Sequence, residues 1–344
     1  MMKTFQEIYK EVFDKKKKWD YYSDNGIHFE YPFSETSRSS DFIKNYIEMS
    51  GKSVNKLFNK IEELEPYRLT HIISTFFLGV HLYENSKTIK NAIDNELQQF
   101  CKSDNVQFSY IWFLISLFHD LGYSYENGKG VKYKSLKNFI RHQSARRKLG
   151  NCIGIPQIYG AIHEKYFLYR ISKQNKNDHG ICAAHVLHND LCEIREELEQ
   201  EHNPDTHVSW KKSLEKVYNY ASWIILAHNM WYVKVNDNNA KCYQCYGLDE
   251  LILCKDEYKI SLEKYPFLFL FCLVDSIEPL KRIKDITLLD KLFLEIDDKK
   301  QKLILKSELK CACHERVIEQ AKDMNNWLTP VEEAEDEIEI KLVS

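Results

Sequence analysis

Apolar segments of helical length recur along this chain, and each carries a histidine or an acidic residue within its apolar run or at its end. In the segment 67–85 the apolar residues are three and four positions apart, the spacing of a helix face that packs in a core. The segments are 67–85 with His71, 107–120 with His119 and Asp120, 178–193 with His179, 210–230 with His228, and 265–282 with Asp275. A buried imidazole or carboxylate needs a partner, so the sequence predicts a helical core in which polar groups meet.

Helix-breaking residues are scarce, with 11 glycines and 7 prolines in 344 residues. We therefore predict a mainly α protein. The period changes near the C-terminus, where LFLEID and KLILKS flank the polar DKKQ and predict a β-hairpin. Three regions are expected. They are an N-terminal helical extension over 1–66, a core over 67–282 with an insertion at about 123–177, and a C-terminal extension over 283–344 with the hairpin, a short helix and an acidic tail.

Charge and hydropathy argue against a membrane or nucleic-acid partner. Lys and Arg number 48 against 51 Asp and Glu, so the formal net charge of -3 gives no general attraction to nucleic acid. The start of the chain lacks the apolar core of a signal peptide, and the longest apolar runs are about half the length that spans a bilayer. Ten cysteines without an export signal indicate reduced thiols. We expect a cytoplasmic protein with no membrane partner.

The pair His119-Asp120 is weak evidence of a metal site when taken alone, because a His-Asp dipeptide also marks a helix that leaves the core. The same arrangement recurs on the other apolar segments. Several imidazoles and carboxylates that converge from separate helices are typical of a metal site with mixed nitrogen and oxygen ligands. The set as a whole therefore favours metal binding.

The order of these motifs resembles the HD superfamily of metal-dependent phosphohydrolases. That family has a histidine on one helix, a His-Asp pair on the next and a distant aspartate on a later helix. Here RLTHIIS supplies His71, LISLFHDLG supplies His119 and Asp120, and FCLVDSIEPLKR supplies Asp275. The resemblance covers about residues 67–282 and implies an HD-type helical bundle.

Two further motifs, DHG at 178–180 and AHN at 227–229, fall where members with two metals carry additional ligands. The resemblance implies one metal held by His71, His119, Asp120 and Asp275, and a second held by Asp120, His179 and His228. The divalent ions implied are Mn, Fe, Co, Ni or Zn, with Mg a further candidate. In the alternative, one metal binds, and His179 and His228 contact the substrate phosphate or act as acid.

The resemblance also implies the reaction. A hydroxide that bridges two metals attacks phosphorus in a phosphoester or phosphoanhydride bond of a nucleotide, with Asp120, His179 and His228 as the catalytic residues. Candidate substrate-binding residues are Tyr123, Glu126, Arg141 and Arg282. One alternative is a deoxynucleoside triphosphate triphosphohydrolase in nucleotide-pool control or phage defence. Another is a non-catalytic nucleotide-sensing module. A homo-oligomer is a further expectation, and nucleic acid is a disfavoured substrate.

Other histidines compete for these roles. His81 is ten residues after His71, about 15 Å along a helix, so one site cannot use both. His71 is the choice because Arg-Leu-Thr precedes it, as in the family. His185 and His188 are expected to point away from the metal and to lie at the surface.

Overall fold

The structure is a computed structural model. It describes residues 2–19, 28–100, 106–126, 133–200, 210–254, 257–308, 312–334 and 337–343. It is mainly α-helical with a small antiparallel sheet near the C-terminus, which confirms the predicted fold class. The chain forms two compact units. The first comprises Met1–Phe42, Pro66–Ser116 and Tyr258–Ser344, and the second comprises Ile43–Glu65 and Leu117–Glu257.

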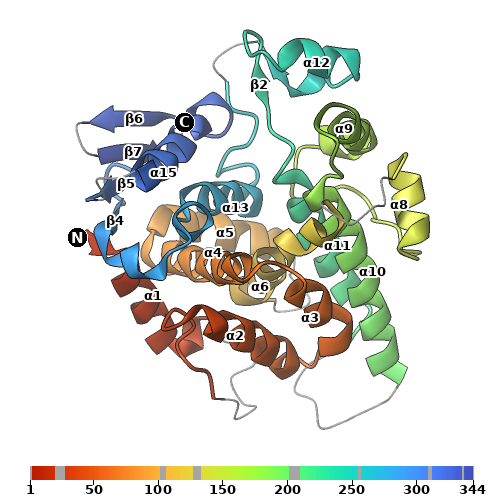
Figure 1. The fold of residues 1–344 in the computed structure, drawn as a ribbon, viewed down its shortest axis with the longest axis horizontal. Coiled ribbons are helices and arrows are strands. Elements are labelled where there is room, and N and C mark those ends of the chain that lie inside the picture. Colours follow the sequence, from red (N-terminus) through yellow and green to blue (C-terminus); the bar gives the residue numbers. More distant parts are fainter. Residues whose placement is uncertain are drawn as a thin grey trace. The chain divides into compact units, whose positions relative to one another are not determined.

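The helices of the first unit surround the apolar segments predicted at 67–85 and 265–282 (Figure 1). Its helices are α1 (Phe5–Asp14), η1 (Lys16–Lys18), α4 (Pro66–Asn85), α5 (Lys87–Phe100), α13 (Pro266–Ile277), α14 (Leu280–Ile283), η4 (Ile286–Lys291), α15 (Ala312–Asp323) and η5 (Met324–Asn326). Helix α4 packs against α1, α5 and α13, and almost all of its length is buried. Removal of this apolar surface from water stabilises the unit by about 25 cal/mol per Å².

Local signals set where two of these helices begin. Thr4 caps α1 by accepting a hydrogen bond from the backbone of Glu7, whose side chain accepts one from the Thr4 backbone in return. Pro266 occupies the first turn of α13, where its missing N–H costs no hydrogen bond. The predicted single helix over 265–282 is wrong in one respect, because α13 ends at Ile277 and α14 begins at Leu280. Pro279 lies at this break and has no N–H to continue the helix.

The sheet of the first unit has the order β1-β4-β5-β7-β6. Its strands are β1 (Lys3–Thr4), β4 (Leu292–Asp297), β5 (Lys302–Ser307), β6 (Val331–Ala334) and β7 (Glu337–Lys341). The predicted hairpin is present as β4 and β5, with Leu294 opposite Leu305. The acidic tail contains the strand β7, which pairs with β5 and buries Ile338 and Ile340. Helix α15 lies against β6 and β7 (Figure 1).

The second unit is built around a long helix, α10, which runs alongside α11 (Figure 1). Its elements are α3 (Val54–Glu62), η2 (His119–Gly122), α7 (Tyr123–Glu126), α8 (Leu136–His142), α9 (Ile158–Gln174), α10 (His179–Gln200), α11 (Leu214–Ala227), β2 (Val233–Lys234), α12 (Ala240–Cys245), η3 (Asp249–Leu251) and β3 (Ile252–Leu253). Helices α2 (Thr36–Met49) and α6 (Phe108–Phe118) begin in the first unit and end in the second. The predicted insertion contains α8 and α9, and its residues 127–132 lie outside the described residues.

No helix in the described part of the chain has both the length and the apolar character needed to cross a bilayer.

Candidate metal-ligand pairs

The first unit brings together His71 of α4 and Asp275 of α13. Their Nε2 and Oδ1 atoms are 3.3 Å apart, and the His71 side chain is buried. Two donors bound to one ion with bonds of 2.0–2.1 Å at a tetrahedral angle lie about 3.3–3.4 Å apart. The pair therefore has the separation of two ligands of one ion.

His71 is oriented by a residue that the sequence analysis did not select. Its Nδ1 donates to Glu278 Oε2 at 2.5 Å, so its Nε2 is the nitrogen that faces Asp275. Burial lowers the pKa of His71, but the Glu278 and Asp275 carboxylates outweigh it and raise that pKa overall. The Glu278 side chain also accepts a hydrogen bond from Ser74, which is paired with Tyr9. A carboxylate behind a ligating imidazole is a common feature of metal sites.

The ammonium group of Lys281 lies beside Asp275. Lys281 Nζ donates to both carboxylate oxygens, at 2.7 and 2.8 Å. The break between α13 and α14 places this lysine close to the aspartate, with only part of either side chain exposed. A metal at Asp275 therefore has to share or displace this ammonium group.

The second unit brings together His179, at the start of α10, and His228, at the end of α11. Their Nε2 atoms are 3.3 Å apart, and both residues are buried. His228 Nδ1 donates to the Ile225 carbonyl at 2.5 Å, so its Nε2 carries a lone pair. His179 Nδ1 is 3.6 Å from Glu126 Oε2, a position that favours the proton on Nδ1 and a lone pair on Nε2. Two lone pairs that face each other need a cation between them, either a proton or a metal ion.

Two glycines allow these elements to approach closely. A Cβ on Gly122, in η2, would lie 1.8 Å from the carbonyl oxygen of His179. A Cβ on Gly180 would lie 2.8 Å from the Ile225 carbonyl oxygen and 3.1 Å from the His228 ring. The contacts of 1.8 and 2.8 Å with backbone oxygens are closer than a Cβ atom tolerates, so glycine is required for η2 and α11 to pack against the start of α10.

His119 and Asp120 lie in η2 and are fully buried. His119 Nε2 is 3.2 Å from Asp120 Oδ1, again a separation that fits two ligands of one ion. The His119 ring lies 5.7 Å from that of His228, centre to centre. The apolar helix α6 thus ends in a tight turn that keeps an imidazole and a carboxylate beside the histidine pair of α10 and α11.

Charged and aromatic groups surround the His179–His228 pair. The Tyr123 ring stacks on His179 at 4.0 Å, and Glu126 receives a hydrogen bond from Arg170 at 3.0 Å. Arg170 also lies 3.4 Å from Asp178. Asp178 accepts a hydrogen bond from Asn229 and another from the backbone N–H of Ile181 in the first turn of α10.

The predicted substrate residues separate into two groups. Tyr123 and Glu126 lie against His179, as just described. Arg141 is exposed on α8, and Arg282 donates to Gln320 of α15 at 2.7 Å. Neither arginine forms a hydrogen bond or an ion pair with a predicted metal ligand in the described part of the chain.

The competing histidines differ from expectation in one respect. His81 lies further along α4 from His71 and accepts a hydrogen bond from Asn85. His185 and His188 were expected at the surface, but that prediction is wrong, because each is only 6% exposed. Both lie on α10, which packs against neighbouring elements on several sides.

Sequence reasoning missed Glu278, Asp178, Asn229 and Arg170. Three of them have a local signal, since they stand within or beside the motifs DSIEP, DHG and AHN, which supply the candidate ligands. Arg170 has none, because its partners Glu126 and Asp178 belong to other parts of the chain.

Comparisons of the chain with family models, with curated proteins and with solved structures found no match. The likeness to HD phosphohydrolases therefore rests on the sequence motifs alone and stays a prediction.

Proposed function

We propose that this protein is a divalent-metal-dependent phosphohydrolase that acts on a nucleotide. The observation that carries the proposal is the His179–His228 pair, in which two buried imidazoles direct their Nε2 atoms at each other across 3.3 Å. A buried histidine pair of this kind suits Mn, Fe, Co, Ni or Zn better than Mg. The order of the motifs in the sequence supports the choice of phosphoryl chemistry.

The remaining ligand pairs support the same proposal. His119–Asp120 and His71–Asp275 each present one nitrogen and one oxygen at 3.2 and 3.3 Å, and their imidazoles are fully buried. All three pairs thus combine burial with a separation that suits an ion. The resemblance to the HD superfamily implies two metals, with Asp120 shared between both.

A bound divalent metal supplies Lewis acidity and lowers the pKa of water at the site. The chain's own residues then have definite tasks. The Ile225 carbonyl accepts a hydrogen bond from His228 Nδ1, and the negative charge of Glu126, 3.6 Å from His179 Nδ1, favours a proton on that nitrogen. Lys281 keeps a positive charge beside Asp275, where it can offset the negative charge of a phosphoryl oxygen.

The test is a panel of nucleoside monophosphates, deoxynucleoside triphosphates, cyclic nucleotides and oligonucleotides with several divalent metals. We expect release of phosphate, pyrophosphate or triphosphate, or opening of a phosphodiester, from at least one nucleotide with a transition metal. The unmutated protein should bind two metal ions per chain, one for each ligand set that the resemblance implies. No turnover across the panel together with no bound transition metal would contradict the proposal.

Two substitutions separate the ligand sets. Asp120→Ala should abolish turnover and remove both metals, because this carboxylate is shared in the proposed arrangement. His179→Ala should remove one metal and leave the other. His142→Ala is the matched control, because His142 is an exposed histidine on α8 and its removal should leave metal content unchanged. Metal bound without turnover of any nucleotide would favour the non-catalytic sensing module instead.

A further inference from the structure

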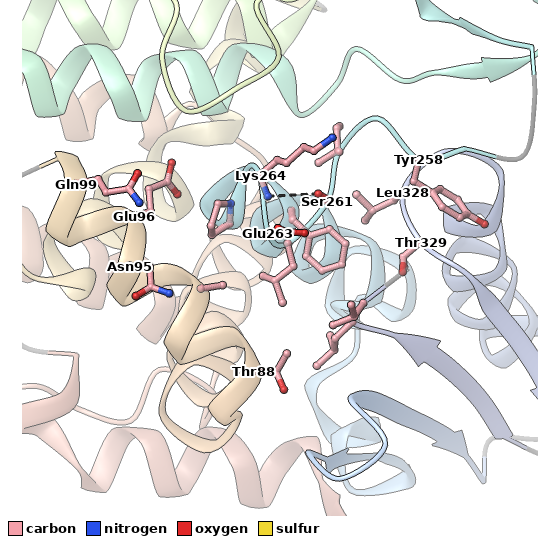
Figure 2. A pocket seen from close by; sticks show the side chains of 17 residues that line it. Thr88, Asn95, Glu96, Gln99, Tyr258, Ser261, Glu263, Lys264, Leu328 and Thr329 are labelled. Carbon is pink, nitrogen blue, oxygen red and sulfur yellow. Dashed lines mark hydrogen bonds between the residues drawn. The ribbon is translucent and has the colours of Figure 1, made fainter.

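The first unit contains a pocket that none of the proposed metal ligands lines. Its volume is about 570 Å³, within the range of small-molecule sites. It lies between α5 and the segment that leads into α13, with residues near the end of the chain on its far side (Figure 2). A cavity of this size can enclose a molecule as large as a nucleoside.

One wall of the pocket is polar and belongs to a single helix. Asn95, Glu96 and Gln99 lie on α5 at spacings of one helix face, and Figure 2 shows them together on one side of the pocket. The carboxylate of Glu96 only accepts hydrogen bonds, whereas the amides of Asn95 and Gln99 both accept and donate them. A ligand with N–H donors is therefore a better complement to it than a ligand with acceptors alone.

The charge of the lining argues against a phosphate-bearing ligand. It carries the carboxylates Glu96 and Glu263 against the single ammonium group of Lys264. Sites for phosphate usually gather arginines, and the lining residues include none. The balance favours a neutral or cationic molecule.

The floor of the pocket is apolar. Leu262, Phe269 and Leu328 line the pocket and are buried. Leu328 lies across the pocket from the α5 residues (Figure 2). Tyr258 adds an aromatic ring beside them, with its hydroxyl group donating to Asn325. A flat ring gains from contact with such a surface.

We propose that this pocket binds a phosphate-free heterocycle with an exocyclic amino group, the chemistry that adenosine and cytidine share. The ring lies against the apolar floor, and the amino group donates to the α5 wall, with Glu96 as its charged acceptor. Phe269 belongs to α13, the helix that also carries Asp275. A ligand in the pocket therefore contacts the helix that carries a candidate metal ligand. The binding itself does not depend on the proposed hydrolase activity.

The experiment is calorimetric titration of the full chain with adenosine, cytidine, inosine, uridine and AMP. Inosine and uridine carry a carbonyl in place of the amino group, so they test the hydrogen bond to α5. We expect adenosine or cytidine to bind at least about tenfold more tightly than its carbonyl counterpart, the factor that one hydrogen bond to a charged group provides. AMP should bind no more tightly than adenosine.

Substitutions locate the binding. Ala92→Trp fills the pocket from α5 and should abolish binding, whereas Gln98→Trp places the same side chain on an exposed position of α5 outside the lining and should leave it intact. Glu96→Gln should reduce the preference for the amino group. His179→Ala should not change nucleoside binding, which separates this pocket from the proposed metal site.

Three results would overturn the inference: no binding of any amino-bearing nucleoside at millimolar concentration, tighter binding of AMP than of adenosine, or unchanged binding in Ala92→Trp. If Ala92→Trp does not fold, as judged by circular dichroism, Glu96→Gln decides. An unaltered preference for the amino group in that variant then counts against the proposal.

Discussion

Glu278 connects several elements of the first unit through one buried carboxylate. It accepts hydrogen bonds from the side chains of His71 and Ser74 and from the backbone N–H groups of Leu280 and Lys281. It therefore sets the ring orientation of His71 and at the same time holds the start of α14. A residue of this kind affects metal affinity without touching the metal.

Replacement of Glu278 by glutamine should weaken metal binding by about 10- to 100-fold, because the neutral amide no longer favours the His71 proton on Nδ1. The folded state should also lose about 1–3 kcal/mol, the usual cost of disturbing a buried hydrogen-bond partner. Metal titration and urea unfolding measure the two effects. Glu319→Gln is the control, because Glu319 is exposed on α15. Unchanged metal affinity in Glu278→Gln would mean that His71 is not a ligand.

The buried His185 should make the folded state sensitive to acid. Burial, together with the neighbouring His163 and His188, lowers its pKa to about 3. Below an ordinary histidine pKa of about 6.5, the unfolded chain therefore binds a proton that the folded chain does not. The contribution of neutral His185 to the stability of the fold is therefore present above pH 6.5 and is lost as the pH falls from 6.5 towards 3.

The His185→Gln variant should lose less stability between pH 6.5 and pH 4 than the unmutated protein, by up to about 3 kcal/mol. Urea unfolding at the two pH values measures the difference. His142→Gln replaces an exposed histidine and should leave the pH dependence unchanged. An equal loss of stability on acidification in His185→Gln and the unmutated protein would rule out this role for His185.

At the scale of secondary structure, the approach of η2 to α10 depends on the absence of a side chain at Gly122. Gly122→Ala would place a Cβ 1.8 Å from the His179 carbonyl oxygen and 2.9 Å from the Ala183 nitrogen. Backbone cannot move aside cheaply, so η2 should shift away from α10 and carry His119 and Asp120 with it. We expect a loss of about 1–3 kcal/mol in stability and reduced metal content.

Gly150→Ala is the matched control for Gly122→Ala. A Cβ at Gly150 would meet only Asn219 atoms at 3.5 Å, which is ordinary contact. Unfolding curves and metal analysis of both variants test the argument. If both alanine variants keep full stability and metal content, close packing of η2 on α10 is not what positions the His-Asp pair.

Helices with one strong apolar pattern were the easiest elements to predict. The segments 67–85 and 178–193 correspond to α4 (Pro66–Asn85) and α10 (His179–Gln200), because helical spacing of apolar residues reports directly on burial. The break at Glu278 and the strand β7 were not predicted. The break has a local signal in Pro279, which the single-helix prediction did not use, whereas β7 depends on its pairing with β5.

The same distinction applies to the candidate site. Candidate ligands such as His228 stand out in the sequence because an imidazole directly after an apolar run is expected to be buried. Arg170 cannot be found in this way, since it is identified by its contacts with Glu126, 44 residues away, and with Asp178, which lies beyond the end of its own helix. Spacing within one helix predicts which side chains share a face, but it contains no information on which other helix they meet.

At the scale of the whole molecule, metal binding and folding should be coupled. The first unit contributes His71 and Asp275 and the second contributes His179 and His228, so the ligand pairs are formed only when each unit is folded. An ion that binds the folded chain and not the unfolded one stabilises it by about 2.7 kcal/mol at a free concentration 100 times its Kd. A chelator should therefore lower the Tm, and a transition metal added in excess should restore it.

Asp120→Ala provides the internal comparison for this measurement, because it should remove both metals. Its Tm should be insensitive to chelator, whereas the Tm of the unmutated protein should fall by several degrees for a loss of this size. His142→Ala should respond to chelator as the unmutated protein does. A Tm that is the same with and without chelator in the unmutated protein would show that no metal ion holds these ligand pairs together. The lone pairs of His179 and His228 would then be satisfied by a single shared proton, and the case for a metal-dependent hydrolase would fail.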